Sequence, residues 1–114
     1  MSEKKHLTVL WTSGDPITAD TMVFMYTINS LAHDWWDKVT LVIWGGSTKL
    51  VSEDEHIQAR IKDALEAGVN VTACKGCSDR LGVTEKLETL GIEVKYWGVE
   101  LTKVLKKEDP LLTI

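Results

Sequence analysis

Residues 7–16 read Leu7-Thr8-Val9-Leu10-Trp11-Thr12-Ser13-Gly14-Asp15-Pro16 and contain a complete transition from a strand to a helix. The first six residues are aliphatic, β-branched or aromatic, which is typical of a strand buried within a sheet. Asp15 is a favourable N-cap, and Pro16 suits the first helical position because its missing N–H would have no partner there. The segment therefore predicts a strand over residues 7–12 and a helix from 16 to about 32.

The same unit recurs along the chain. Ser52-Glu53-Asp54-Glu55 has the pattern of a capping box that opens another helix, Gly68 and Gly91 stand where helices end, and Gly82 divides a helical stretch into two pieces. We expect further strands at residues 38–44, 69–74, 92–96 and 111–114, and further helices at residues 52–67, 75–90 and 101–105. This alternation predicts an α/β fold in which right-handed crossovers place helices on both faces of a five-stranded parallel sheet.

The composition is that of an ordinary globular domain. The 114 residues suit one hydrophobic core, so we expect a single domain over 1–114. Hydrophobic residues make up 44% and charged residues 26%, which argues against disorder. The net charge of −4 gives no electrostatic reason to expect nucleic acid or an anionic membrane as a partner. Trp35, Trp36 and Trp97 are interpreted either as subunit contacts or as a cap over the core.

The chain shows no pattern of a targeting signal or of a membrane span. Its basic start, Met1 to Lys5, is followed by an apolar run too short for a signal peptide, and no stretch approaches the ~20 apolar residues of a membrane helix. We therefore expect a cytoplasmic protein in a compartment that keeps thiols reduced. There, two cysteines three positions apart are more often reactive or metal-binding than joined in a structural disulfide.

Three segments follow predicted strands: Ser13-Gly14-Asp15, Gly45-Gly46 and Cys74-Lys75-Gly76-Cys77. Because the carboxyl ends of parallel strands lie at one edge of a sheet, the fold should bring these segments together. Ligands of open parallel sheets bind at this edge, near a switch in strand order. The sequence therefore predicts a site there, in which the residues of the first two segments, with Lys75 and Gly76, bind around the cysteines.

The cysteine pair carries the most specific chemistry. Cys74 leaves a strand directly into a helix start, where backbone N–H groups and the helix dipole stabilise a thiolate. Lys75 adds positive charge, and Gly76 leaves room for a partner sulfur to approach. Cys77, three residues on, could resolve a persulfide or a mixed disulfide formed on Cys74.

Two other interpretations of the pair stay open. Free cysteines are among the most buried residue types, so both thiols could simply pack in the core. Metal binding within one chain is weaker, because His6, His33 and His56 lack ligand spacing to the pair, and we expect no such metal. A metal shared between subunits is a further alternative.

Thr12-Ser13-Gly14-Asp15, Trp44-Gly45-Gly46, the segment 72–83 around both cysteines and the ending from Tyr96 to Ile114 form a recognisable set. With these residues the whole chain resembles the DsrE/DsrF-like sulfur-relay family. The resemblance implies a three-layer α/β/α sandwich of flavodoxin-like or Rossmann-like topology, usually assembled into trimers or hexamers. It also implies that Cys74 carries a persulfide and passes sulfur to a partner protein. Cys77 departs from the family pattern, which rests on a single cysteine.

The resulting prediction is an intracellular sulfur-relay or persulfide-carrier protein, a sulfurtransferase in the sense of a sulfur carrier. It would form a homo-oligomer, need no organic cofactor, and work with sulfur-donor and sulfur-acceptor proteins. Two alternatives remain. One is a non-catalytic oligomeric binding or assembly module in which the cysteines pack or bind metal. The other is a thiol–disulfide switch formed by Cys74 and Cys77.

Overall fold

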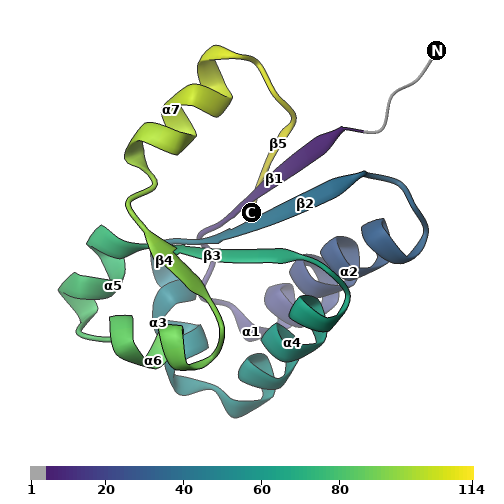
Figure 1. Cartoon of the computed structure of the whole chain (residues 1–114). Helices are drawn as coiled ribbons and strands as arrows, with labels where there is room; N and C mark the ends of the chain where they lie inside the picture. Colours follow the sequence, from purple (N-terminus) through teal and green to yellow (C-terminus); the bar gives the residue numbers. More distant parts are fainter. Residues whose placement is uncertain (1–4) are drawn as a thin grey trace.

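The computed structural model describes residues 5–114, so most of the start that was searched for a targeting signal, residues 1–4, lies outside the described residues. The chain forms a five-stranded parallel sheet in the order β4-β3-β2-β1-β5 (Figure 1). Its strands are β1 (His6–Trp11), β2 (Lys38–Ile43), β3 (Asn70–Cys74), β4 (Glu93–Lys95) and β5 (Leu111–Thr113). The predicted sheet is confirmed, and each strand ends within one residue of its expected bounds.

Helices fill the connections between the strands. They are α1 (Pro16–Thr18), η1 (Ala19–Phe24), α2 (Met25–Ala32), α3 (Gly46–Glu53), α4 (Glu55–Glu66), α5 (Lys75–Leu81), α6 (Thr84–Thr89) and α7 (Gly98–Lys106). The expected first helix is one continuous stretch whose middle, η1, has the wider π-helical turn. Asp15 caps it as predicted, since the Thr18 N–H donates to Asp15 Oδ2 at 2.8 Å. Gly82, at φ +70°, separates α5 from α6.

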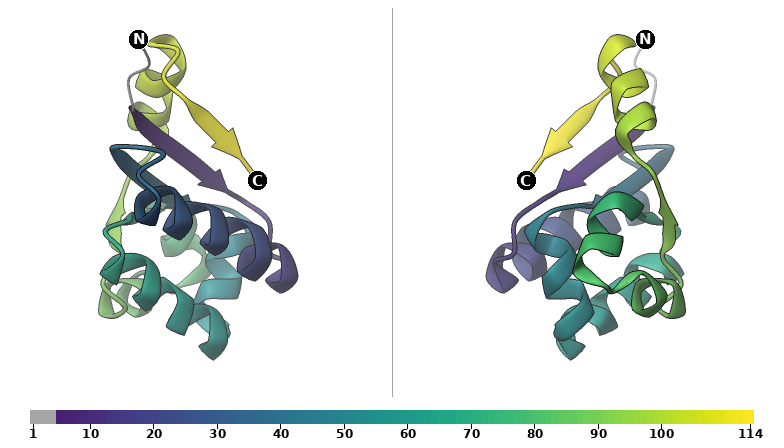
Figure 2. Two further views of the ribbon diagram at one scale, coloured as in Figure 1. Left: turned by 90° about the vertical axis from the view of Figure 1, so that its right-hand side faces the viewer. Right: turned by 90° about the vertical axis from the view of Figure 1, so that its left-hand side faces the viewer.

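The direction of the crossovers decides which face each helix covers. From β1 to β4 every step moves the same way across the sheet, so right-handed crossovers place the intervening helices on one face. The step from β4 to β5 passes back across β3, β2 and β1, which places α7 on the opposite face (Figures 1 and 2). The result is a three-layer arrangement in which α7 alone forms the third layer.

Two apolar clusters lie on the two faces. The larger one fills the space between the sheet and the helices α1–α6 and includes Trp11, whose ring meets Phe24 edge-on with centroids 5.4 Å apart. Trp36 packs against this cluster, whereas Trp35 is half exposed. The smaller cluster has Val42, Cys74 and Trp97 at its centre. Both cysteines therefore belong to the smaller cluster or pack against it.

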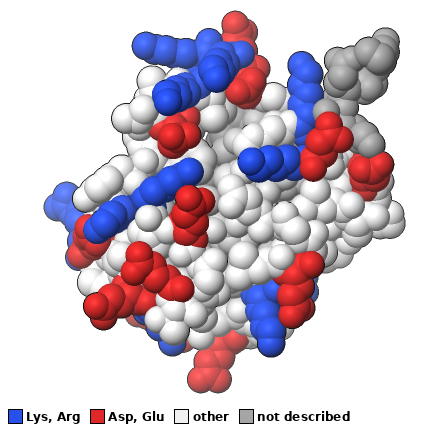
Figure 3. Space-filling model, viewed as in Figure 1, with Lys and Arg blue, Asp and Glu red and all other residues white. Residues whose placement is uncertain are grey.

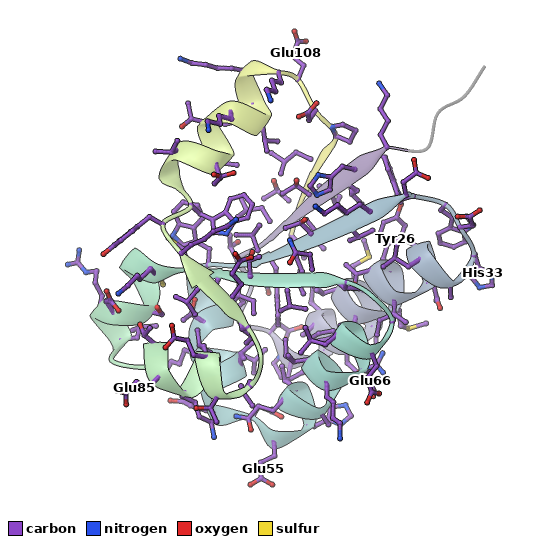
Figure 4. The ribbon with its side chains drawn as sticks, viewed as in Figure 1. Tyr26, His33, Glu55, Glu66, Glu85 and Glu108 are labelled. Atoms are coloured by element: carbon purple, nitrogen blue, oxygen red, sulfur yellow. The ribbon has the colours of Figure 1, made fainter. Side chains whose placement is uncertain are left out.

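The capping box predicted at Ser52 to Glu55 is wrong. Ser52 closes the last turn of α3, where its hydroxyl donates to the Lys49 carbonyl at 2.8 Å. The N-cap of α4 is Asp54, whose Oδ1 accepts from the Ile57 N–H at 3.0 Å. Figure 4 shows Glu55 pointing away from the fold instead of back toward Ser52.

Helix α3 was not expected, because Gly45-Gly46-Ser47-Thr48 is a poor helix-forming sequence. Tertiary contacts stabilise it. The Ser47 hydroxyl is fully buried and donates to the Trp11 carbonyl at 2.6 Å, which ties the start of α3 to the end of β1. Local propensity is a weak predictor where such a buried contact is available.

Close packing of two glycines joins the loops after β1 and β2. A Cβ on Gly46 would lie 3.0 Å from the Thr12 carbonyl oxygen and 3.1 Å from the Gly14 nitrogen. A Cβ on Gly14 would lie 3.2 Å from the Gly46 oxygen. Both contacts are with backbone atoms, so larger residues would force the two loops apart.

We expect Gly46→Ala to lower the free energy of unfolding by about 1–3 kcal/mol, the usual cost of overpacking. Gly76→Ala is the matched control, because nothing lies within 4 Å of its added Cβ. In the first turn of α5 that change should raise stability by up to about 1 kcal/mol. Urea denaturation of both variants measures the difference, and equal stabilities would show that the glycine contact does not constrain the loops.

Candidate functional site

The crossover direction changes between β3 and β4, which are neighbours in the sheet. The chain leaves β3 into α5 on the larger helical layer, and it leaves β4 toward α7 on the other face. In open parallel sheets, such a switch point opens a crevice outside the carboxyl ends of the two strands. Cys74 is the last residue of β3 and therefore lies beside this crevice.

Cys74 is the N-cap of α5, with an extended backbone at φ −77° and ψ 119°. Its side chain is on the α7 side of the sheet, in the smaller apolar cluster with Val42 and Trp97. The residue is only 6% exposed. The predicted position at a strand end and helix start is thus confirmed, and the thiol lies under cover instead of facing solvent.

Cys77, one helical turn further, is half-buried and contacts the loop after β2. Its Sγ lies 3.5 Å from Thr48 Oγ1 and 3.8 Å from the Gly45 carbonyl oxygen. Gly46 in turn touches Gly14 in the loop after β1. The structure thereby brings the three predicted segments to one edge of the sheet, as expected from the parallel topology.

Ser13 and Asp15 are engaged in local capping. The Ser13 hydroxyl accepts from the Asp15 N–H at 3.1 Å. Hydrogen bonds from the Thr18 N–H and then from the Thr18 hydroxyl hold the pKa of Asp15 below its ordinary value. Local structure is therefore sufficient to explain both side chains.

A hollow of about 300 Å³ lies beside the glycine contact. It is lined by Gly14, Gly46, Lys49, Leu50 and Glu53. Two of the predicted binding residues thus border an open space, but neither cysteine lines it. The edge of the sheet accordingly carries two separate features, the hollow near α3 and the covered thiol at the end of β3.

Lys75 was expected to add positive charge beside the cysteines, but it pairs with an acidic side chain. Its Nζ lies 2.8 Å from Asp79 Oδ2, and this hydrogen bond raises the pKa of Lys75. The bond from Lys75, followed by the one from Thr84, lowers the pKa of Asp79. Lys75 Nζ also lies 5.7 Å from the centroid of the Tyr96 ring. Its charge is therefore balanced by Asp79, whereas Gly76 does face open space as the sequence suggested.

Trp97, which packs in the cluster of Cys74, follows β4, and this segment was not among those predicted to form the site. Lys95 is the register partner of Cys74, and its Nζ lies 5.3 Å from the centroid of the Trp97 ring. Trp97 is 5% exposed and packs in the cluster of Cys74. The sequence could have indicated Trp97. Ligands bind outside the carboxyl ends of parallel strands, and the residues after the fourth strand lie at that edge like those after the first three.

Residues 5–114 offer neither a metal site nor a membrane helix. No group of three or more His, Cys, Asp or Glu side chains in this range is arranged to hold a metal ion. No helix in the same range is long and apolar enough to cross a membrane. The two cysteines and the residues packed on them are therefore the features of the described chain with the most specific chemistry.

Comparisons with known proteins agree with this architecture. A conserved protein of unknown function from Bacteroides thetaiotaomicron (BT1422) is 38% identical, with a TM-score of 0.93 over 96% of this chain and 94% of that one. The ychN protein from E. coli is 17% identical and has the same fold, with a TM-score of 0.68 over 98% of this chain and 100% of that one. The comparison with curated proteins found no match. The family model of the DsrE/DsrF-like family matches residues 5–114, and the chain belongs to this family.

Proposed function

We propose that the protein is a sulfur carrier that binds sulfur as a persulfide on Cys74 and passes it to an acceptor thiol. Membership of the DsrE/DsrF-like family, which is linked to sulfur relay, supports this class of function. The single observation that carries the assignment to Cys74 is its place at the end of β3, beside the switch point.

The surroundings of Cys74 suit a bound sulfane sulfur. The residue is the N-cap of α5, and its side chain makes no capping hydrogen bond, so the thiol is not committed to the helix start. Val42 and Trp97 pack on it and keep bulk water away. A persulfide is readily lost to other thiols, and a covered position slows such side reactions.

The proposed reaction needs no outside oxidant. The Cys74 thiolate attacks the outer sulfur of a donor persulfide, the sulfur–sulfur bond of the donor breaks, and its electron pair leaves with the donor thiolate. Cys74 then holds the transferred sulfur as a persulfide. An acceptor thiolate attacks this outer sulfur in the same way and regenerates the Cys74 thiolate.

Cys77 supports a second candidate function, a thiol–disulfide switch. Cys74 is the N-cap and Cys77 the third residue of α5, so less than one helical turn separates the two thiols. This spacing is compatible with the short Cβ–Cβ distance of a disulfide. If the Cys77 thiolate attacks the inner sulfur of a Cys74 persulfide, a disulfide forms and hydrosulfide leaves. In that case Cys77 limits the lifetime of the carried sulfur.

We further propose that the protein works as a homo-oligomer, a trimer or a hexamer, in a cytoplasmic compartment that keeps both thiols reduced. Tyr96, Val99 and Leu105 expose large apolar side chains on and beside α7. A groove of about 440 Å³ along α7 is lined by Gly98, Val99, Thr102, Lys103 and Lys106. Figure 3 shows basic and acidic side chains next to each other over α7, with white, uncharged surface between them and the next charged side chains. A second copy of the chain would cover this apolar surface.

The two cysteines should respond differently to a polysulfide. After incubation with a polysulfide, the wild type should gain about 32 mass units per sulfur, and Cys74→Ser should gain none. Cys77→Ser should load and hold the sulfur longer, because it lacks the second thiol. A loss of about 2 mass units in the wild type alone would instead indicate the Cys74–Cys77 disulfide and favour the switch.

Intact-protein mass spectrometry distinguishes these outcomes. Loading of Cys74→Ser but not of Cys77→Ser would reverse the assignment. If neither the wild type nor Cys77→Ser gains sulfur, the protein is not a persulfide carrier, and the oligomeric binding module becomes the better interpretation.

The oligomer is tested by charge on α7. Val99 is 65% exposed, and Val99→Asp should dissociate the oligomer because the interface would have to remove a carboxylate from water, which is costly even beside Lys103. Ile17→Asp is the matched control, since Ile17 is 71% exposed on α1 in the other helical layer. Light scattering should give a smaller mass for Val99→Asp and the wild-type mass for Ile17→Asp. A monomeric wild type, or the reverse response of the two variants, would contradict the proposed interface.

A further inference from the structure

Trp97 contains a buried polar group that the fold leaves unpaired. Its indole Nε1 is fully buried and has no hydrogen-bond partner among the described residues. An unpaired buried N–H costs about 1–3 kcal/mol, so native structures rarely retain one without a reason. The side chain follows β4 and packs beside the switch point described above.

The cluster around Trp97 contains side chains that could accept a hydrogen bond from this N–H. Its other members are Val42, Cys74, Leu10, Trp44, Cys77 and Leu101. Aliphatic side chains and indoles accept no hydrogen bond, so among the side chains of this cluster the two sulfur atoms are the ones that can accept. The Cys77 thiol donates toward Thr48 Oγ1 and the Gly45 carbonyl, so its sulfur lies against the segment that follows β2, whereas Cys74 is one of the three buried residues at the centre of the cluster. Within residues 5–114, the Cys74 thiol makes no side-chain hydrogen bond, either with Trp97 or with another residue.

Trp11 provides a comparison inside the same molecule. Its Nε1 is also buried and unpaired, but Trp11 packs with Phe24 in the larger cluster, which contains neither cysteine. The two tryptophans therefore differ in the side chains packed around them. Of the two unpaired indoles, Trp97 is the one that shares its cluster with a thiol.

We infer that the Trp97 indole N–H is the hydrogen-bond donor that stabilises the negatively charged sulfur of Cys74. A neutral thiol is a weak acceptor, whereas a sulfur anion is a strong one, so the bond forms when Cys74 ionises. Lys95 lies in register with Cys74, and its ammonium lies 5.3 Å from the centroid of the Trp97 ring and 3.9 Å from Glu93 Oε1, so its charge is partly balanced. The nearby Lys75 is paired with Asp79. This inference rests on the proposed function, in which the ionised sulfur of Cys74 is the group that takes up and carries sulfur.

The test uses Cys77→Ser as the background, so that Cys74 is the single thiol. Trp97→Phe keeps an apolar ring over Cys74 but removes the N–H. At about pH 7, iodoacetamide should then alkylate Cys74 roughly tenfold more slowly, because the thiolate has lost a charge-assisted hydrogen bond. The difference should vanish near pH 10, where the thiol is ionised in both proteins. Trp35→Phe, at a half-exposed tryptophan in another part of the fold, should leave the rate unchanged.

If Trp97 only shielded Cys74 sterically, Trp97→Phe would not slow the alkylation of Cys74. Phenylalanine is smaller than tryptophan, so without the hydrogen bond Trp97→Phe would react equally fast or faster at every pH, and this result would overturn the inference. Trp97→Leu, which opens the cover further, should still react more slowly than the background protein at about pH 7. Alkylation does not require sulfur loading, so a protein that fails to take up polysulfide yet shows this pH profile would refute the carrier function and leave the role of Trp97 intact.

Discussion

The handedness of the crossovers is the constraint on which the rest of the structure depends. Four strands are added in one direction, and only the return from β4 to β5 moves against it. Because crossovers are right-handed, that reversal places α7 on the otherwise helix-free face and creates a switch point between β3 and β4. The cysteine that ends β3 and the tryptophan that follows β4 meet there for that reason. Chain topology, more than any local motif, thus determines the environment of Cys74.

The polar residues at the same edge serve mainly to hold the edge together. Asp15 and Ser13 cap the first helix, Ser47 ties α3 to β1, and Lys75 is balanced by Asp79. Gly14 and Gly46 allow two loops to touch. The residues that cover Cys74 are instead large and mostly apolar. A thiol in such a place is screened from water and from chance collisions, which suits a group that holds a labile sulfur between two transfers.

Much of this could be predicted from the sequence, because several signals were local. Alternation of apolar runs with capped helices gave all five strands, and Asp15, Gly82 and Gly91 marked helix ends correctly. Helix α3 was missed because its stability comes from the buried Ser47 contact, which a local pattern does not contain. The capping residue of α4 was misassigned for a related reason. Ser52 and Asp54 both suit an N-cap, and the unexpected helix before them decides between the two.

The candidate site was predictable in position but incompletely in its residues. Cys74 was placed correctly, since it directly follows an apolar run. The partner of Lys75 depends on the turn between α5 and α6, and the contact of Trp97 with Cys74 depends on which face α7 takes. Neither follows from sequence spacing alone. Strand order was needed to identify the switch point, and strand order is a tertiary property.

The central claim is that Cys74 is the residue on which sulfur is carried. Peptide mapping of the wild-type protein tests it most directly, after brief exposure to a polysulfide and alkylation of all free and persulfide sulfurs. Fragmentation of the peptide that contains both cysteines should place the additional mass of about 32 on Cys74. The same mass on Cys77, or no modified peptide at all, would contradict the proposed role of the thiol at the end of β3.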